Sequence, residues 1–125
     1  MTRNTFLLIL LSVAFSASAQ ILLKMGMATP AIQAILADGL GLGTVLGVFG
    51  NWRVLLGLLV YFLSAAVWLL VLARVDVSLA YPFVGLGVVL TMLFGWLIRN
   101  EPLSAGRIGG TALIVAGIVF ITRSA

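Results

Sequence analysis

The chain lacks cysteine and histidine, and only 3 of its 125 residues are Asp or Glu. Without cysteine there is no disulfide framework, and without either residue type the usual zinc sites are excluded. Charged residues make up 8% of the sequence, whereas they make up about a quarter of an average water-soluble domain. Hydrophobic residues make up 63%, so too few charges remain to cover a globule of this size. The composition therefore indicates an integral membrane protein.

Four apolar segments are long enough to cross a membrane. A hydrocarbon core of about 30 Å requires roughly 20 apolar residues in a helix, which also satisfies its own backbone polar groups in lipid. The segments lie at about residues 5–24, 52–72, 79–98 and 105–121. The connections at 73–78 and 99–104 are short, so neighbouring helices should form antiparallel hairpins. We therefore expect an all-α integral membrane fold, with residues 1–125 as a single domain of four transmembrane helices.

The connection between the first two segments is longer than the others. Thr29-Pro30 is typical of a helix start and Asp38-Gly39 of a helix end, which predicts a short interfacial helix between them. Residues 39–50 contain five glycines among apolar residues. We expect this stretch to be flexible and too short for a fifth span, with a re-entrant loop as the alternative.

The N-terminal segment also has features of a cleaved signal peptide. Arg3, the apolar run 6–11 and the small residues 17–19 before Gln20 fit that pattern. However, apolar residues resume at 21–23, so the run is long enough to span a membrane. We expect this helix to be retained.

The basic residues flank the apolar segments. The side with both termini would carry Arg3, Arg74 and Arg123, and the opposite side Lys24, Arg53, Arg99 and Arg107. Lipid headgroups are the expected partners of these charges, and no basic stripe with interleaved aromatics suggests nucleic acid. Because the Lys/Arg imbalance sets orientation, two interpretations stay open. Either a few charges or a partner decide the orientation, or the chain inserts both ways and forms an antiparallel dimer.

One face of the first segment is polar. Ser12, Ser16, Gln20 and Lys24 recur every four residues, so they share one side of a helix. Polar groups facing lipid are costly, which favours a groove lining for this face. The alternative is that the serines permit close helix packing while Lys24 extends to the interface. Gln20 favours the groove, because a buried amide needs hydrogen-bond partners.

The acidic residues all lie in connections. Asp38, Asp76 and Glu101 fall outside the four segments. Proton coupling through a carboxylate buried in the membrane is therefore not expected. The sequence also shows no nucleophile–base pair, phosphate loop or metal-ligand cluster, so we expect neither an enzyme nor a bound cofactor or metal.

Glycines and prolines predict local features of the last two segments. Pro82, Gly85 and Gly87 predict a bend near the start of the third segment. Gly110 and Gly117, one heptad apart, favour a seam between subunits, with packing inside one subunit as the alternative. Glu101 and Ser104 are expected to build a structural turn, with Ser104 capping the fourth helix.

These motifs resemble the small multidrug resistance branch of the drug/metabolite transporter superfamily. The resemblance is carried by Leu79-Ala80-Tyr81, Gly85-Leu86-Gly87, Glu101-Pro102 and the Gly110/Gly117 heptad. Two departures argue against a proton/drug antiporter. Ser16 stands where those exporters have an essential glutamate, and Val84 stands where a tryptophan is expected.

A subgroup of that branch, the aminoarabinose-lipid flippase subunits of the ArnE/ArnF type, fits better. Its motifs read here as Gln20…Lys24, Ala80-Tyr81-Pro82 and Glu101-Pro102-Leu103-Ser104, although residues 28–51 form a longer connection than usual. The resemblance implies movement of a polyprenyl-phosphate-linked sugar, such as undecaprenyl phosphate–aminoarabinose, across the bacterial inner membrane. A homodimer or a heterodimer with a paralogous subunit would work by alternating access. Lys24 would neutralise the phosphate, while Gln20, Ser16 and Tyr81 would hydrogen-bond the headgroup.

Two other functions remain as alternatives. One is an exporter of cationic drugs or polyamines, which the missing intramembrane acid disfavours. The other is a non-transporting subunit that scaffolds a membrane glycosyltransferase or a partner flippase subunit.

Overall fold

The computed structural model describes residues 2–124, and within them the chain is a row of long helices. The long helices are α1 (Arg3–Met27), α4 (Trp52–Leu72), α6 (Val84–Arg99) and α7 (Ala105–Ser124). Shorter elements connect them, namely α2 (Pro30–Ala37), α3 (Leu42–Phe49), α5 (Val77–Ala80) and the 3-10 turn η1 (Tyr81–Phe83). Four stretches, with α5 through α6 counted as one, are long and apolar enough to span a membrane. The expected four-helix membrane fold is confirmed.

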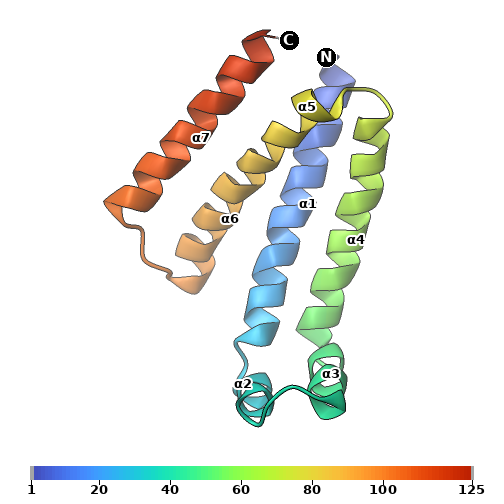
Figure 1. Ribbon diagram of the computed structural model, residues 1–125, viewed down its shortest axis with the longest axis vertical. Coiled ribbons are helices and arrows are strands. Elements are labelled where there is room, and N and C mark those ends of the chain that lie inside the picture. Colours follow the sequence, from blue (N-terminus) through green and yellow to red (C-terminus); the bar gives the residue numbers. More distant parts are fainter. Residues whose placement is uncertain (1, 125) are drawn as a thin grey trace.

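The spatial order of the helices differs from their order in the chain. In Figure 1 they stand as α4, α1, α6 and α7, and the contacts agree, because α1 packs against both α4 and α6 while α7 packs against α6 and η1. The pairs α1–α4 and α6–α7 run antiparallel. The first helix is therefore central to the fold, although its sequence resembles a leader peptide.

Small residues allow α1 and α4 to approach closely. Ser12 Oγ donates to the Ser64 carbonyl (2.9 Å), and Ser64 Oγ donates to the Ser12 carbonyl (2.8 Å). At Gly26 an added Cβ would lie 3.0 Å from the backbone nitrogen of Val54, and at Gly57 one would lie 3.1 Å from the backbone nitrogen of Leu23. Since hydrophobicity cannot drive helix association in lipid, close packing and such hydrogen bonds hold this pair together.

A small core joins all four spans near the end that carries both termini. It consists of Ile9, Val13, Val71, Ala80, Phe83 and Ile118. Phe6 and Phe83 meet edge to face, with ring centroids 6.1 Å apart, a favoured aromatic geometry. Apart from Ile118, α7 contributes no buried residue among those described.

The third span begins earlier than expected and is interrupted. The helix starts at Val77 rather than near 79, and the 3-10 turn Tyr81–Phe83 separates α5 from α6. Pro82 lies in this turn, whereas Gly85 and Gly87 lie in α6. An added Cβ at Gly85 would lie 2.7 Å from the Ile114 side chain. Gly85 therefore makes room for α7, and the change of helix type occurs at Pro82.

The turn between α6 and α7 is ordered by backbone bonds. Asn100 adopts the left-handed conformation (φ 55°), and the Glu101 N–H donates to the Gly95 carbonyl (3.1 Å). The left-handed residue and this backbone bond end α6 and lead the chain into the turn. Ser104 Oγ accepts from the Arg107 N–H (3.1 Å), as an N-cap of α7 does.

Residues 42–49 of the glycine-rich stretch 39–50 form a helix, so the expectation of a flexible segment there is wrong. The short helix α2 was expected, but it is followed by α3, and together they form a lobe beyond the ends of α1 and α4 (Figure 1). The Ile35 side chain packs over Gly47, and a side chain at position 47 would clash with it. Packing of apolar residues on glycine thus compensates for the low helix propensity of glycine.

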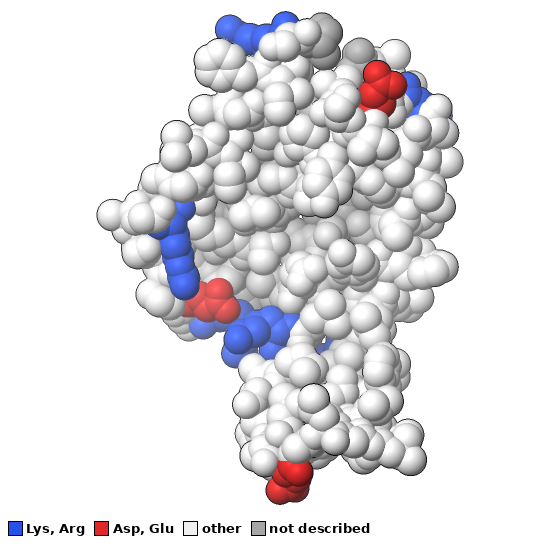
Figure 2. All heavy atoms as spheres, in the orientation of Figure 1, with Lys and Arg blue, Asp and Glu red and all other residues white. Residues whose placement is uncertain are grey.

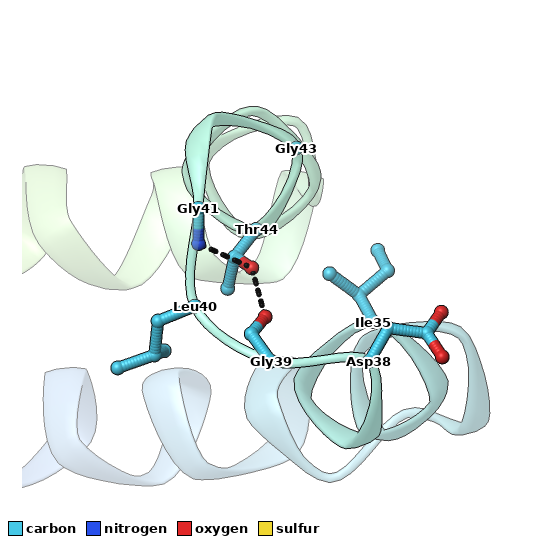
Figure 3. Close-up of a pocket in the computed structure, with 7 residues that line it drawn as sticks. All are labelled: Ile35, Asp38, Gly39, Leu40, Gly41, Gly43 and Thr44. Atoms are coloured by element: carbon cyan, nitrogen blue, oxygen red, sulfur yellow. Dashed lines mark hydrogen bonds between the residues drawn. The ribbon is translucent and has the colours of Figure 1, made fainter.

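A tight turn connects the two helices of this lobe. Gly39 has φ +100°, a conformation that glycine adopts without strain. Thr44 Oγ donates to the Gly39 carbonyl (2.7 Å) and accepts from the Gly41 N–H (3.2 Å), as Figure 3 shows. A hollow of about 370 Å³ lies at this turn. Its lining residues all come from 35–44, away from the four spans.

Candidate functional site

A groove runs along the row of long helices. Its larger part, about 710 Å³, is lined by residues of α1, α4, α6, α7 and the α6–α7 turn. A smaller part of about 250 Å³ continues toward η1. The two parts share Ser16, Tyr61, Val84 and Gly87, so they form one continuous groove. The larger volume is within the range of sites that hold small ligands.

The groove is open along its length rather than enclosed. Gln20, Tyr61, Val84, Val88 and Gly110 all line it and are exposed. In a membrane, such an opening faces the lipid or a neighbouring subunit. A molecule in the groove could therefore keep an apolar part outside it.

Polar side chains from each long helix line the middle of the groove. Ser16 and Gln20 come from α1, Tyr61 from α4, Thr91 from α6 and Thr111 from α7. Such groups facing acyl chains would be costly. Their convergence gives the groove a polar lining.

The two ends of the groove differ in charge. Tyr81, which is 64% exposed, lies at the end near the termini. Glu101 and Arg107 line the opposite end, and we call these two residues the charged end. One guanidinium nitrogen of Arg107 donates to the Pro102 carbonyl (2.8 Å). The groove thus joins a neutral polar end to one that has both signs of charge.

Basic side chains gather at two levels of the molecule (Figure 2). Lys24 lies in the last turn of α1 and Arg99 in that of α6, while Arg53 and Arg107 lie in the first turns of α4 and α7. Because the helices alternate in direction, these four cations share the end at which the α2–α3 lobe lies. Arg53 also lies over the Trp52 ring, 5.1 Å from its centroid, an arrangement suited to a membrane interface.

The structure brings together some of the residues predicted for the site. Ser16, Gln20 and Tyr81 line the groove, and Gly87 and Gly110 form parts of its wall. Ser12 lines the smaller part, but it is buried and bonded to Ser64. Gly117 faces open space.

Lys24 stands apart from the groove. It is exposed at the end of α1 and is not among the residues that line either part of the groove. At this end of the groove, the lining cation within residues 2–124 is Arg107.

Sequence reasoning missed several groove residues, among them Tyr61, Thr91 and Arg107. Tyr61 and Thr91 are polar side chains inside predicted spans, and this signal could have singled them out. Arg107 was counted only as a flanking charge, because the position of α7 beside α6 was not known. Glu101 was assigned to the turn, which it helps to form, but it is also among the residues that line the groove.

The groove lining has polar and charged groups suited to binding a ligand. Within the described residues, no group of three or more His, Cys, Asp or Glu side chains could hold a metal ion. Its hydroxyl, amide, carboxylate and guanidinium groups can hydrogen-bond and neutralise a polar headgroup.

Comparison with known proteins places the chain in a family. A family model described as putative transmembrane family 234 matches residues 8–122. The chain belongs to the putative transmembrane family 234. No solved structure matches it.

Curated relatives of the chain are named as probable flippase subunits. The chain is 43% identical over 70 residues to a probable 4-amino-4-deoxy-L-arabinose-phosphoundecaprenol flippase subunit ArnE of Pseudomonas aeruginosa, a match covering 56% of the chain and 61% of the relative. It is 40% identical over 84 residues to the ArnE of Pseudomonas syringae, covering 66% and 78%. It is 44% identical over 68 residues to a probable flippase subunit ArnF of Erwinia tasmaniensis, covering 53% and 54%.

These matches confirm the resemblance to the ArnE/ArnF type. The chain spans about three fifths of the length of the first relative and about half that of ArnF. Together, these matches and the four apolar helices show that the chain is a multi-pass membrane protein of this family.

Proposed function

We propose that this protein is a subunit of a flippase that moves a polyprenyl-phosphate-linked amino sugar, such as undecaprenyl phosphate–aminoarabinose, across the bacterial inner membrane. The names of the relatives support this function. The structural observation that carries it is the open polar groove, with Tyr81 at one end and the charged end at the other.

A lipid-linked sugar needs shielding only for its headgroup. Its apolar tail gains nothing from entering the protein and can remain among the acyl chains. A groove that is open along its length and lined with Ser16, Gln20, Tyr61 and Thr91 meets this requirement. The larger part, about 710 Å³, has room for a sugar phosphate.

Gln20 is the central polar residue of the proposed path. Its amide offers both donors and acceptors to sugar hydroxyls and phosphate oxygens. Ser16 lies one turn away and lines both parts of the groove, so it extends the path toward Tyr81. Lys24 remains a candidate for phosphate attraction at the membrane surface, where its side chain is exposed.

A proton-coupled exporter of drugs or polyamines is disfavoured, because the carboxylate residue that lines the groove, Glu101, lies at its end and not inside a long helix. Ser16 lines both parts of the groove at the position where the resemblance to multidrug exporters requires a glutamate. Asp38 and Asp76 lie outside the long helices, and Glu101 lies in the α6–α7 turn. We therefore propose transport by alternating access in a dimer, without a carboxylate inside a long helix to carry protons. The proposal includes no catalytic step.

The assembly is proposed to be a dimer. Only 6% of the most apolar 18 residues of α7 are buried within the chain, and Gly117 leaves open space on its surface. A second copy or a paralogous subunit would pack there, because glycines let helices approach closely in lipid. The nearly balanced cations at the two ends are compatible with an antiparallel arrangement.

Headgroup translocation in proteoliposomes tests the function. The protein, alone or with an ArnF-type second subunit, is expected to move a short-chain polyprenyl phosphate–amino sugar between leaflets. Gln20→Ala is expected to reduce the rate about tenfold or more, since a buried polar headgroup would lose a hydrogen-bonded partner.

The matched control is Ser18→Ala, which changes an exposed polar residue of α1 that does not line the groove. It should leave the rate unchanged. Translocation by Gln20→Ala at the wild-type rate would remove this residue from the path. No movement by wild-type protein in either assembly would instead favour the scaffold function.

A further inference from the structure

The charged end has an acidic side chain held against a helix. The Glu101 carboxylate lies over Gly95 of α6, where an added Cβ would be 2.5 Å from Oε2. The hydrogen bond that joins Glu101 to α6 comes from its backbone N–H. The helix end is therefore formed by the backbone, the carboxylate takes no part in that bond, and Glu101 is among the residues that line the groove.

Arg107 gives the same end a cation. It lies in the first turn of α7, is exposed, and lines the same part of the groove. A guanidinium has five N–H donors in a planar fork, and the structure records one bond from it, to Pro102. Donors therefore remain for an anion, and the fork suits two oxygens of one phosphate.

The two charges can be placed relative to the membrane. Lys24, Arg53 and Arg99 lie at the same end of the helices. Figure 2 shows acidic and basic side chains adjoining at the level of the α6–α7 turn. The charged end is thus where the groove meets the headgroup region, and where a headgroup would be selected.

We propose that Glu101 and Arg107 form a recognition site for a zwitterionic headgroup, one with an ammonium and a phosphodiester a few bonds apart. Arg107 binds the phosphodiester and Glu101 binds the ammonium. The site rests on the proposed function, whose lipid substrate has both groups, and it adds a basis for selectivity. A phosphate-linked sugar without a free amine would leave the Glu101 carboxylate near the phosphate without a cation.

Binding in detergent, measured by native mass spectrometry, tests this site without requiring transport. The two probes are a short-chain polyprenyl phosphate–amino sugar and its N-acetylated form, in which the amine has no charge. Wild-type protein is expected to bind the free amine about tenfold more tightly, as a charge-assisted hydrogen bond requires. Glu101→Gln should bring the ratio close to one, because affinity for the free amine falls while affinity for the N-acetylated lipid stays the same or rises.

Substitution of Arg107 should instead weaken the binding of both lipids. Arg107→Gln is expected to weaken both about tenfold or more, because both have the phosphodiester, and Arg107→Lys should recover part of the loss. Glu101→Gln keeps the size of the side chain, so it leaves the packing over Gly95 in place.

Gly95→Ala provides a variant whose helix should be retained. The added methyl group meets the movable end of the Glu101 side chain, and alanine favours a helix more than glycine does. It should displace the carboxylate and lower the preference for the amine without loss of thermal stability.

Each outcome decides between the two proposals. Equal binding of both lipids by wild-type protein, or a preference unchanged in Glu101→Gln, would overturn the recognition site. An equal loss for both lipids in Glu101→Gln would assign the residue to the turn alone. Selective binding by a protein that moves neither lipid in proteoliposomes would support the site and contradict the flippase function.

Discussion

The α1–α4 pair and the α6–α7 pair are both antiparallel helix pairs rich in small residues, but they use those residues differently. Gly26 and Gly57 lie against the backbone of the partner helix, whereas Gly109 and Gly117 face open space. Among the most apolar 18 residues of each helix, 33% are buried in α1 and 6% in α7. The first pair is therefore closely packed, whereas the second pair leaves much of α7 exposed and forms one wall of the groove.

The largest expected effect on stability comes from Gly26→Ala. The new methyl group would lie 2.6 Å from a Val54 side-chain carbon and 3.0 Å from its backbone nitrogen, so α1 and α4 must separate. Overpacking of this kind costs about 1–3 kcal/mol. Thermal unfolding in detergent, monitored by tryptophan fluorescence, should show a lower midpoint.

Gly109→Ala is the matched control, because its methyl group would meet nothing within 4 Å. Its midpoint should stay the same or rise, since alanine favours a helix. Equal destabilisation by both variants would show that the two pairs are packed alike.

A smaller loss of stability is expected when the hydroxyl of Ser12 or Ser64 is removed. Ser12→Ala or Ser64→Ala should each cost about 1 kcal/mol, within the range measured for hydrogen bonds between membrane helices. The double variant should cost less than the sum of the two, because the two hydroxyls bond the same pair of residues.

Thr111→Ala is the corresponding change in α6–α7. The Thr111 hydroxyl bonds the Arg107 carbonyl of its own helix (2.7 Å) and the Met92 sulfur (3.2 Å). Because sulfur is a weak acceptor, the loss should be smaller than for Ser12→Ala. A larger loss would reverse the proposed ranking of the two pairs.

The smallest effect on the folded chain is expected from Gly117→Leu. Nothing lies within 4 Å of an added Cβ at Gly117, so the unfolding midpoint should be unchanged. If α7 forms the dimer seam, the leucine should keep the two helices apart and lower the yield of chemically cross-linked dimer. A yield equal to wild type would place the seam elsewhere.

The spans could be predicted from sequence because length and apolar character decide them in lipid. The predicted range 52–72 matches α4, whose Asn51 side chain caps the first turn by accepting from Arg53 and Val54 N–H groups. The helix α3 was missed because its stability comes from Ile35 packing on Gly47. Local propensity does not reveal such a tertiary contact.

The groove was predictable only in part. The four-residue spacing from Ser12 to Lys24 marked one face of α1, but twist along the helix and the position of α4 separate its members. Ser12 lines the smaller part of the groove but is bonded to α4, Ser16 and Gln20 line the larger part, and Lys24 is not among the lining residues. Tyr61 of α4 and Arg107 of α7 reach the groove because α1 packs beside α6. This packing cannot be predicted from any one segment.

Thiol labelling tests most directly whether the groove is hydrated. The chain has no cysteine, so each single-cysteine variant gives one unambiguous signal. Gln20→Cys and Thr91→Cys change groove residues, whereas Leu113→Cys and Phe120→Cys change α7 residues that are each 75% exposed. Thiols react as thiolates, which form in water but not among acyl chains.

In proteoliposomes, a water-soluble maleimide should modify the two groove cysteines about tenfold faster or more than the two α7 cysteines. The amino-sugar lipid should slow this labelling by occupying the groove. Groove cysteines that react no faster than Leu113→Cys would show that the groove is filled by acyl chains, and this would contradict the proposed headgroup path.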